Sequence, residues 1–174
     1  LTENIKCGGE QAIRVVVTNK AWDKLALNNQ GKDNIHPEAI YEELLPLELD
    51  PREPFNVSSE IQTVTVCDEI NLPAITAFRL LASRLMEQGS TNPILLKDTL
   101  IPEESGLASN IALLRASVVI GSLLSDGVGD AILIRGERNP KLSLKLSYNI
   151  LQAVGCRSFK TDYVACPSCG RTLF

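Results

Sequence analysis

The sequence has few aromatic residues and a single histidine. Phe, Trp and Tyr make up 5% of the 174 residues, and His36 is the only histidine. So few rings argue against a stacking platform for single-stranded nucleic acid. One histidine excludes Ser-His-Asp and Cys-His hydrolase schemes unless His36 alone serves them. Because His36 precedes Pro37 in a polar stretch, we interpret it as a solvated loop residue.

The sequence also lacks an excess of positive charge and a long apolar run. The formal net charge is -4, and no stripe of Lys and Arg is present to neutralise phosphates, so we expect no nucleic-acid partner. No apolar run reaches the roughly 20 residues that cross a bilayer. The most apolar stretch, Leu107 to Leu124, contains Asn110 and Arg115 and is interpreted as a buried helix. We therefore expect no membrane contact and a cytoplasmic protein.

Motifs for nucleotide phosphates are missing as well. Neither G-x-G-x-x-G nor a Walker pattern occurs. The segment SDGVGD, residues 125–130, has two glycines, but Asp126 and Asp130 would repel an anion. We predict a plain turn there. The opening LTENIKCGGE shows neither a start methionine nor a signal peptide, so we expect a piece of a longer protein.

What the sequence does contain is an alternation of strand-like and helix-like segments. Parallel strands joined by covering helices give this order, so the predicted fold class is α/β. Right-handed crossovers leave two architectures open, a doubly wound sheet and part of a (β/α) barrel. The expected strands are 13–19, 61–68, 92–98, 131–137 and 161–166, and the expected helices are 21–27, 36–49, 75–89, 107–124 and 141–155.

The expected helix 36–49 carries an acidic cluster. Pro37 stands where a helix can begin, and apolar residues recur at helical spacing. Glu38, Glu42 and Glu43 are predicted to share the exposed side of this helix. A solvated face is the expected role for such a cluster, ahead of catalytic carboxylates.

Of the five cysteines, two near the end of the chain indicate a metal or cluster site. Cys67 lies in an apolar strand, where a small buried side chain is expected. Cys166 and Cys169 form a C-P-x-C turn that directs two thiolates at one centre, as in half of a zinc or iron–sulfur ligand set. Gly170 follows at once, which disfavours a thioredoxin-type redox motif. Cys156 is the nearest further candidate, and we expect the missing ligands beyond Phe174.

Two strings in the C-terminal third resemble one enzyme family. GSLLSDGVGDAILI and SYNILQAVGCRSFKTDYVACPSCGRTLF are similar to the region around the first cluster cysteines of 4-hydroxy-3-methylbut-2-enyl diphosphate synthase. Residues 1–120 resemble the middle domain inserted in the large, plant-type form. The resemblance implies that residues 1–155 are this inserted domain, a degenerate (β/α) TIM-barrel-like unit. Residues 156–174 would begin a truncated iron–sulfur domain.

The family resemblance also implies a reaction. The enzyme is an iron–sulfur oxidoreductase of the methylerythritol phosphate pathway to isoprenoids and terpenoids, and it reductively opens 2-C-methyl-D-erythritol 2,4-cyclodiphosphate. Its 4Fe-4S cluster is bound by three cysteines and a glutamate, of which two cysteines map onto Cys166 and Cys169. Ferredoxin or flavodoxin is the implied electron donor, a homodimer is compatible with the family, and a plant or algal source would place the enzyme in the plastid.

This chain should then be inactive by itself. The family's catalytic barrel and substrate-binding residues have no counterpart here, so no catalytic residue is assigned, and the inserted domain is expected to act as a spacer. One alternative from another class stays open: a non-enzymatic interaction module in which Cys166 and Cys169 share a structural zinc across a dimer. Metal analysis separates the two, since one zinc per two chains indicates the interaction module.

Overall fold

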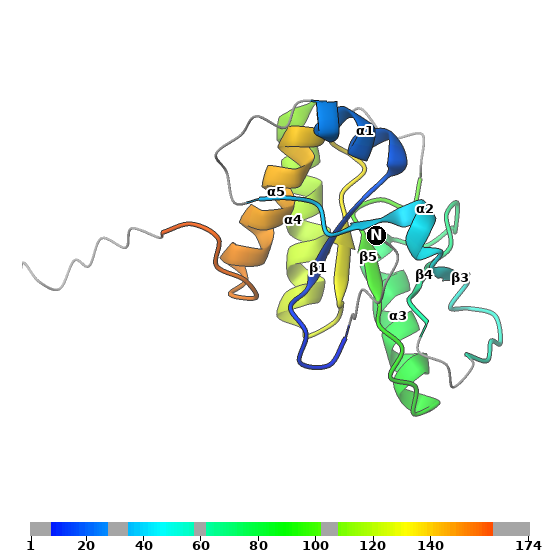
Figure 1. Ribbon diagram of the computed structural model, residues 1–174. Helices are drawn as coiled ribbons and strands as arrows, with labels where there is room; N and C mark the ends of the chain where they lie inside the picture. The colour runs from blue at the N-terminus through cyan, green and yellow to red at the C-terminus, as the bar shows by residue number, and fades with distance from the viewer. Residues whose placement is uncertain (1–7, 28–34, 58–61, 102–107, 162–174) are drawn as a thin grey trace, which may run out of the picture.

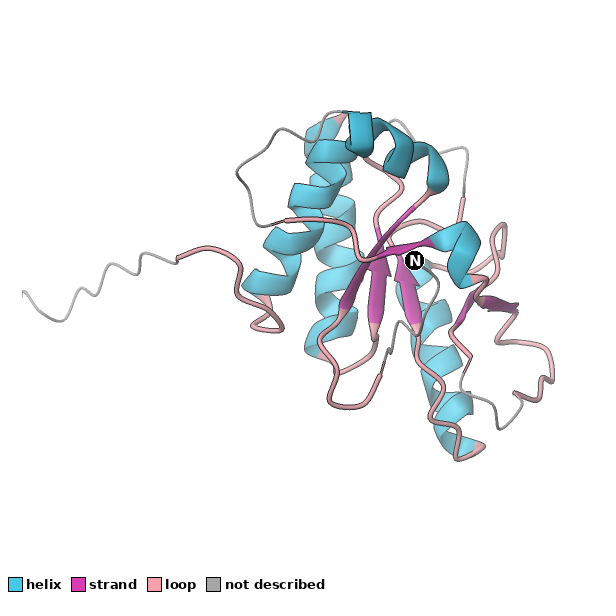
Figure 2. Ribbon diagram, in the orientation of Figure 1, coloured by secondary structure: helices cyan, strands magenta, loops and turns pink. Residues whose placement is uncertain are grey.

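The computed structural model describes residues 8–27, 35–57, 62–101 and 108–161 (Figure 1). Strands and helices alternate through most of these ranges, which confirms the α/β class. In chain order the elements are β1 Arg14–Val17, α1 Asn19–Leu27, β2 Ala39–Ile40, α2 Tyr41–Leu44, β3 Leu47–Leu49, β4 Val64–Val66, α3 Ala74–Glu87, β5 Leu95–Lys97, α4 Ser109–Ser125, β6 Ala131–Leu133 and α5 Pro140–Ala153. Strands β1, β5 and β6 lie at the centre with the long helices outside them, and β3 and β4 lie at one edge (Figures 1 and 2).

All paired strands are parallel, and their neighbours follow the order found around a barrel. One sheet has the order β2-β1-β6-β5, and β3 pairs with β4. A single bridge between Val64 and Ile94 joins β4 to the start of β5. Among the described strands, only the pair β2–β3 is missing from a complete ring of six. Closure into a barrel therefore stays a prediction.

The sheet has two faces of different composition, because side chains alternate along each strand. On what we call the helix-covered face, Val15, Leu96 and Ile132 pack against α3, α4 and α5 in one large apolar core. On what we call the inner face, smaller side chains form a separate cluster. This cluster consists of Val16, Ala39, Leu95, Ala131 and Leu133, with Tyr41 and Leu44 of α2 against it.

Three of the long helices form as their sequences predict. Helix α3 buries Ala77, Phe78, Leu81 and Leu85, which recur at helical spacing. Helix α5 begins with Pro140 at its first position, and the side chain of Asn139 accepts a hydrogen bond from the Lys141 amide at 3.0 Å. Helix α4 packs between α3 and α5 (Figure 1).

The predicted helix over residues 36–49 is wrong. The segment contains β2, the four-residue α2 and β3 instead. Pro46 disfavours a helical backbone at Leu45, which caps α2 in the left-handed region at φ 44°. Ala39 pairs with Val16 in the sheet, so tertiary pairing prevails over the helical spacing of apolar residues.

The interpretation of residues 107–124 as a buried helix is wrong for one side of it. Helix α4 buries Ala112, Ala116 and Ile120 against the core. The opposite side is apolar and exposed, and its four large side chains are between 48% and 61% accessible, namely Ile111, Leu113, Leu114 and Val118. None of the helices in the described ranges combines the length and hydrophobicity needed to span a bilayer.

Candidate binding site at the carboxyl ends of the strands

Three charged residues meet at the carboxyl ends of β4, β5 and β6. Lys97, the last residue of β5, is fully buried, and its Nζ donates to Asp68 Oδ1 at 2.6 Å. Arg135, two residues after β6, donates to both Asp68 oxygens at 2.7 and 2.8 Å. It also donates to the carbonyl of Thr99 at 2.6 Å. We call Lys97, Asp68 and Arg135 the ion cluster.

The ion cluster shifts the pKa of each member. Burial lowers the pKa of Lys97, and the hydrogen bond to Asp68 offsets only part of this effect. Burial alone would raise the pKa of Asp68, but the hydrogen bonds from Arg135 and Lys97 outweigh it, so the pKa is lowered. The lowered pKa keeps the Asp68 carboxylate ionised at neutral pH, where it stays paired with its cationic partners.

A side-chain bridge spans the gap between β2 and β3. The hydroxyl of Tyr41, which follows β2, donates to Glu48 in β3. Burial and this carboxylate raise the pKa of Tyr41, so the phenol stays protonated. Glu48 also lies 3.7 Å from Lys97 Nζ. Strands β2 and β3 do not pair through their backbones. The bridge joins them through side chains and links both to the ion cluster.

Asp98 holds the loop after β6 in place. Its side chain is buried, and its two oxygens accept the amides of Arg135 at 2.7 Å and Gly136 at 3.0 Å. Burial raises the pKa of Asp98, and the two amides offset part of that rise. Gly136 allows this approach, because a Cβ there would lie 2.7 Å from Asp98 Oδ2. The loop that carries Arg135 is consequently bonded to Asp98 at two successive amides.

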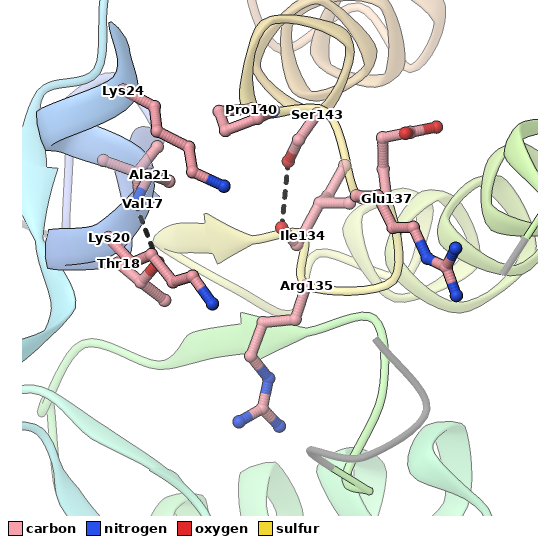
Figure 3. A pocket seen from close by; sticks show the side chains of 11 residues that line it. Val17, Thr18, Lys20, Ala21, Lys24, Ile134, Arg135, Glu137, Pro140 and Ser143 are labelled. Carbon is pink, nitrogen blue, oxygen red and sulfur yellow. Dashed lines mark hydrogen bonds between the residues drawn. The ribbon is translucent and has the colours of Figure 1, made fainter. Parts of the chain in front are cut away.

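A pocket of about 600 Å³ opens beside the ion cluster, between the first turns of α1 and α5 (Figure 3). Its floor is formed by the carboxyl ends of β1 and β6, which are neighbours in the sheet. Lys20 and Lys24 reach from α1 toward its centre (Figure 3). Ser143 donates to the carbonyl of Ile134 at 2.9 Å and closes the α5 side. The remaining lining residues are Val17, Thr18, Ala21, Arg135, Glu137, Arg138 and Pro140.

The predicted cluster cysteines, Cys166 and Cys169, lie outside the described residues. Of the described cysteines, Cys67 is half-buried after β4, where burial raises the pKa of its thiol, and Cys156 is exposed after α5. In the ranges that the structure describes, no three His, Cys, Asp or Glu side chains gather as a metal site would require. The described residues therefore do not provide a ligand set for an iron–sulfur cluster.

The prediction of one solvated acidic face is wrong for Glu38. This residue precedes β2 and is not helical. Its carboxylate accepts the amide of Val15 at 2.9 Å and is bound by Arg157 at 2.7 Å. Glu42 is exposed but accepts the amide of Asn19 at the start of α1 at 2.8 Å. Glu43 is exposed as predicted.

Two other sequence predictions are confirmed. His36 is exposed, and its backbone carbonyl accepts the hydroxyl of Tyr148 at 2.8 Å. The segment 125–130 is a turn in which Asp130 accepts the amide of Ile94 at 2.8 Å. Gly129 has φ +116°, a conformation that favours glycine.

Sequence reasoning missed the ion cluster. The sequence did contain a usable pattern. Each of three apolar strands has a charged residue at its end or shortly after it, in VTVCD, ILLKD and AILIR. Carboxyl ends of neighbouring parallel strands meet at one edge of a sheet, so these side chains were candidates to converge. Which of them pair could not be read from the sequence, because the pairs are 29 and 67 residues apart.

Comparison with known proteins finds homologues for nearly the whole chain. No family model matches. A 4-hydroxy-3-methylbut-2-en-1-yl diphosphate synthase (flavodoxin) of Akkermansia muciniphila is 41% identical over 175 residues, which cover 98% of this chain and 29% of the relative. A synthase (ferredoxin) of Synechococcus elongatus is 34% identical over 131 residues, 68% of this chain and 31% of the relative. One from Picosynechococcus is 40% identical over 100 residues, 58% of this chain and 23% of the relative.

The chain spans less than a third of the length of these curated relatives. The similarity to the first of them extends beyond the C-terminal strings that carried the resemblance and includes the described α/β domain. The sequence-based recognition is thereby confirmed: the chain is homologous to a section of the 4-hydroxy-3-methylbut-2-en-1-yl diphosphate synthases.

Proposed function

We propose that the chain is a section of an oxidoreductase that converts 2-C-methyl-D-erythritol 2,4-cyclodiphosphate to 4-hydroxy-3-methylbut-2-enyl diphosphate in isoprenoid biosynthesis. The observation that supports this most is the 41% identity over 98% of the chain to a protein named as that synthase. The proposal includes a cytoplasmic location, or the plastid for a plant or algal source. The reaction consumes two electrons, and the relatives' names point to flavodoxin or ferredoxin as their source.

The proposal assigns Cys166 and Cys169 as two thiolate ligands of a 4Fe-4S cluster. The C-x-x-C spacing supports it, since two sulfurs three residues apart can bind one metal centre. When bound, the cluster would supply electron transfer to the substrate. The other ligands would come from elsewhere in the longer protein, so the 174-residue chain alone is proposed to be inactive.

The role proposed for the described domain is that of a rigid spacer, with the next domain beginning near residue 156. The contacts of Arg157 support this role. Its guanidinium donates to the carbonyl of Ile13 at 3.0 Å and to Glu38 at 2.7 Å, and it lies 5.2 Å from the centre of the Tyr148 ring. These contacts hold Arg157, just after α5, against the described domain.

The test is a comparison of cysteine variants in the full-length protein. Cys166→Ser and Cys169→Ser should each abolish both the visible absorbance of the reconstituted cluster and conversion of the cyclodiphosphate with reduced flavodoxin or ferredoxin. Cys156→Ser is the matched control, because Cys156 is exposed and is not part of the C-x-x-C motif in the sequence. It should retain absorbance and turnover.

Two results would overturn these assignments. Full-length protein that holds a complete cluster but does not convert the cyclodiphosphate would refute the proposed reaction. One zinc per two chains, lost in Cys166→Ser, would refute the cluster and support the interaction module.

A further inference from the structure

We propose that the pocket between the first turns of α1 and α5 binds a small phosphate ester. The pocket goes beyond the proposed function, and neither depends on the other. The proposal rests on the position of the pocket, its charge and its mixed lining.

The position of the pocket is one that parallel α/β folds use for ligands. Ligands bind outside the carboxyl ends of parallel strands, where the loops to the following helices converge. Here β1 and β6 are adjacent in the sheet although they are more than a hundred residues apart in sequence. Each is followed within a few residues by a helix, so two helix starts face one another across the opening (Figure 3).

The charge of the pocket is opposite to that of the chain. Lys20, Lys24 and Arg138 line it against one carboxylate, that of Glu137, whereas the whole chain has a formal net charge of -4. Lys20 and Lys24 are one helical turn apart, so they share the side of α1 that faces the pocket. Arg135 also lines the pocket, but its guanidinium is bound to Asp68. Such a concentration of positive charge favours a multiply charged anion.

Several amides at the two helix starts already donate within the chain, so we assign the binding to side chains. At the start of α1, the amide of Asn19 already donates to Glu42, and the amide of Ala21 donates to Thr18. At the start of α5, Pro140 has no amide hydrogen, and the amide of Lys141 donates to Asn139. The lysine ammonium groups are therefore the donors that reach the pocket centre.

The lining also explains why an ester is preferred over inorganic phosphate. Val17, Ala21, Ile134 and Pro140 provide apolar surface beside the cations. A volume of about 600 Å³ is far larger than a phosphate ion needs and falls within the range of small-molecule sites. The apolar surface would cover the carbon part of the ligand while the lysines bind its phosphate.

Titration calorimetry on the 174-residue chain tests the proposal with phenyl phosphate, inorganic phosphate and phenol as probes. Phenyl phosphate should bind most tightly, and its affinity should fall as salt is added, because the contacts are ionic. Lys20→Gln combined with Lys24→Gln should weaken its binding by about tenfold or more, because the ionic contacts of both lysines are lost.

Lys145→Gln is the matched control, because Lys145 is exposed on α5 and does not line the pocket. Lys145→Gln should bind phenyl phosphate as the wild type does. The melting temperature should be unchanged in all variants. No phenyl phosphate binding up to about 10 mM, or equal binding by the double variant, would overturn the site. Equal affinities for phenyl phosphate and inorganic phosphate would overturn the assignment of an ester.

Discussion

The two faces of the sheet are stabilised in different ways. The helix-covered face buries large side chains such as Phe78, Leu81 and Ile120 in a continuous apolar core. The inner face has mostly small apolar side chains, and charged groups converge at its carboxyl end. Apolar burial is non-directional and tolerates changes of partner, whereas a buried charge depends on specific partners. The two faces should therefore respond differently to substitution.

The largest expected effect is at Asp68. Asp68→Ala leaves the fully buried Lys97 and the mostly buried Arg135 without their shared carboxylate. Loss of one partner from a buried ion pair costs about 3–5 kcal/mol of unfolding free energy. Leu81→Ala on the helix-covered face is the comparison and should cost about 2–5 kcal/mol through the cavity it leaves. Urea unfolding measures both, and a loss below about 1 kcal/mol for Asp68→Ala would contradict the role of the ion cluster.

The next largest loss of stability is expected from substitutions in the turn between α4 and β6. Gly129→Ala places a Cβ 2.5 Å from Leu96 Cδ1, on the helix-covered face, at φ +116°. Gly127→Ala has a similar positive φ of +77°, but its Cβ meets nothing within 4 Å. Strain alone should cost Gly127→Ala about 1 kcal/mol, and overpacking should add about 1–3 kcal/mol at Gly129. Equal melting temperatures for the two variants would show that the core yields to the added methyl group.

The dependence of stability on pH should separate Asp68 from Asp98. The pKa of Asp68 is lowered in the folded chain, so its contribution is present above its unfolded pKa of about 3.9 and is lost as pH falls through the lower folded value. The stability difference between wild type and Asp68→Asn should therefore shrink on acidification.

The buried Asp98 provides the opposite case. Its pKa is raised on folding, so the protonated form is favoured in the folded chain, and the wild type should gain stability relative to Asp98→Asn as pH falls. Denaturant midpoints between about pH 2 and pH 7 measure both trends. Parallel pH profiles for the two variants would contradict the assigned shifts.

Replacing Lys97 should change the unfolding free energy much less than replacing its partner Asp68. Lys97→Met keeps a long apolar side chain in the buried position, and Asp68 keeps two hydrogen bonds from Arg135. Since an apolar replacement removes the desolvation cost of a buried ammonium, the unfolding free energy should stay within about 1 kcal/mol of wild type or rise. A loss as large as that of Asp68→Ala would show that Arg135 alone does not satisfy the carboxylate.

The smallest effect on stability is expected on the exposed side of the helices that cover the sheet. Arg79 on α3 forms an ion pair with Asp126 after α4 at 2.6 Å, and both side chains are about half exposed. Exposed pairs contribute about 0–1 kcal/mol because water and salt screen them. Arg79→Ala should lower the melting temperature by only a few degrees, and added salt should reduce the difference from wild type. A larger loss would indicate that this pair fixes the packing of α3 on α4.

The helix-covered face was largely predictable from the sequence. The apolar spacing in α3 and the Asn139–Pro140 start of α5 specify helices through local interactions. Runs such as VVV and AIL specify strands because both faces of a parallel sheet are buried. The inner face was not predictable in the same way. Pro46 and the pairing of Ala39 with Val16 together overturned a helical spacing that was locally plausible.

The polar sites were even less accessible to sequence reasoning. Glu38 looked like a surface residue, but Arg157, which lies 119 residues away, pairs with its carboxylate. The exposed side of α4 carries four large apolar side chains, so apolar content alone could not show which side faces the core. The C-x-x-C pair was the opposite case: its spacing was recognisable without any fold, and it lies outside the described residues.

The sequence by itself determined the α/β class, most of the elements and the relationship to the diphosphate synthases, because these depend on local periodicity and on matching strings. Only the tertiary structure decided which charged residues meet at the carboxyl ends of the strands, how Tyr41 and Glu48 bridge β2 and β3, and where the cationic pocket opens. The physical reason is distance along the chain: partners dozens of residues apart interact only once the parallel strands have set their register.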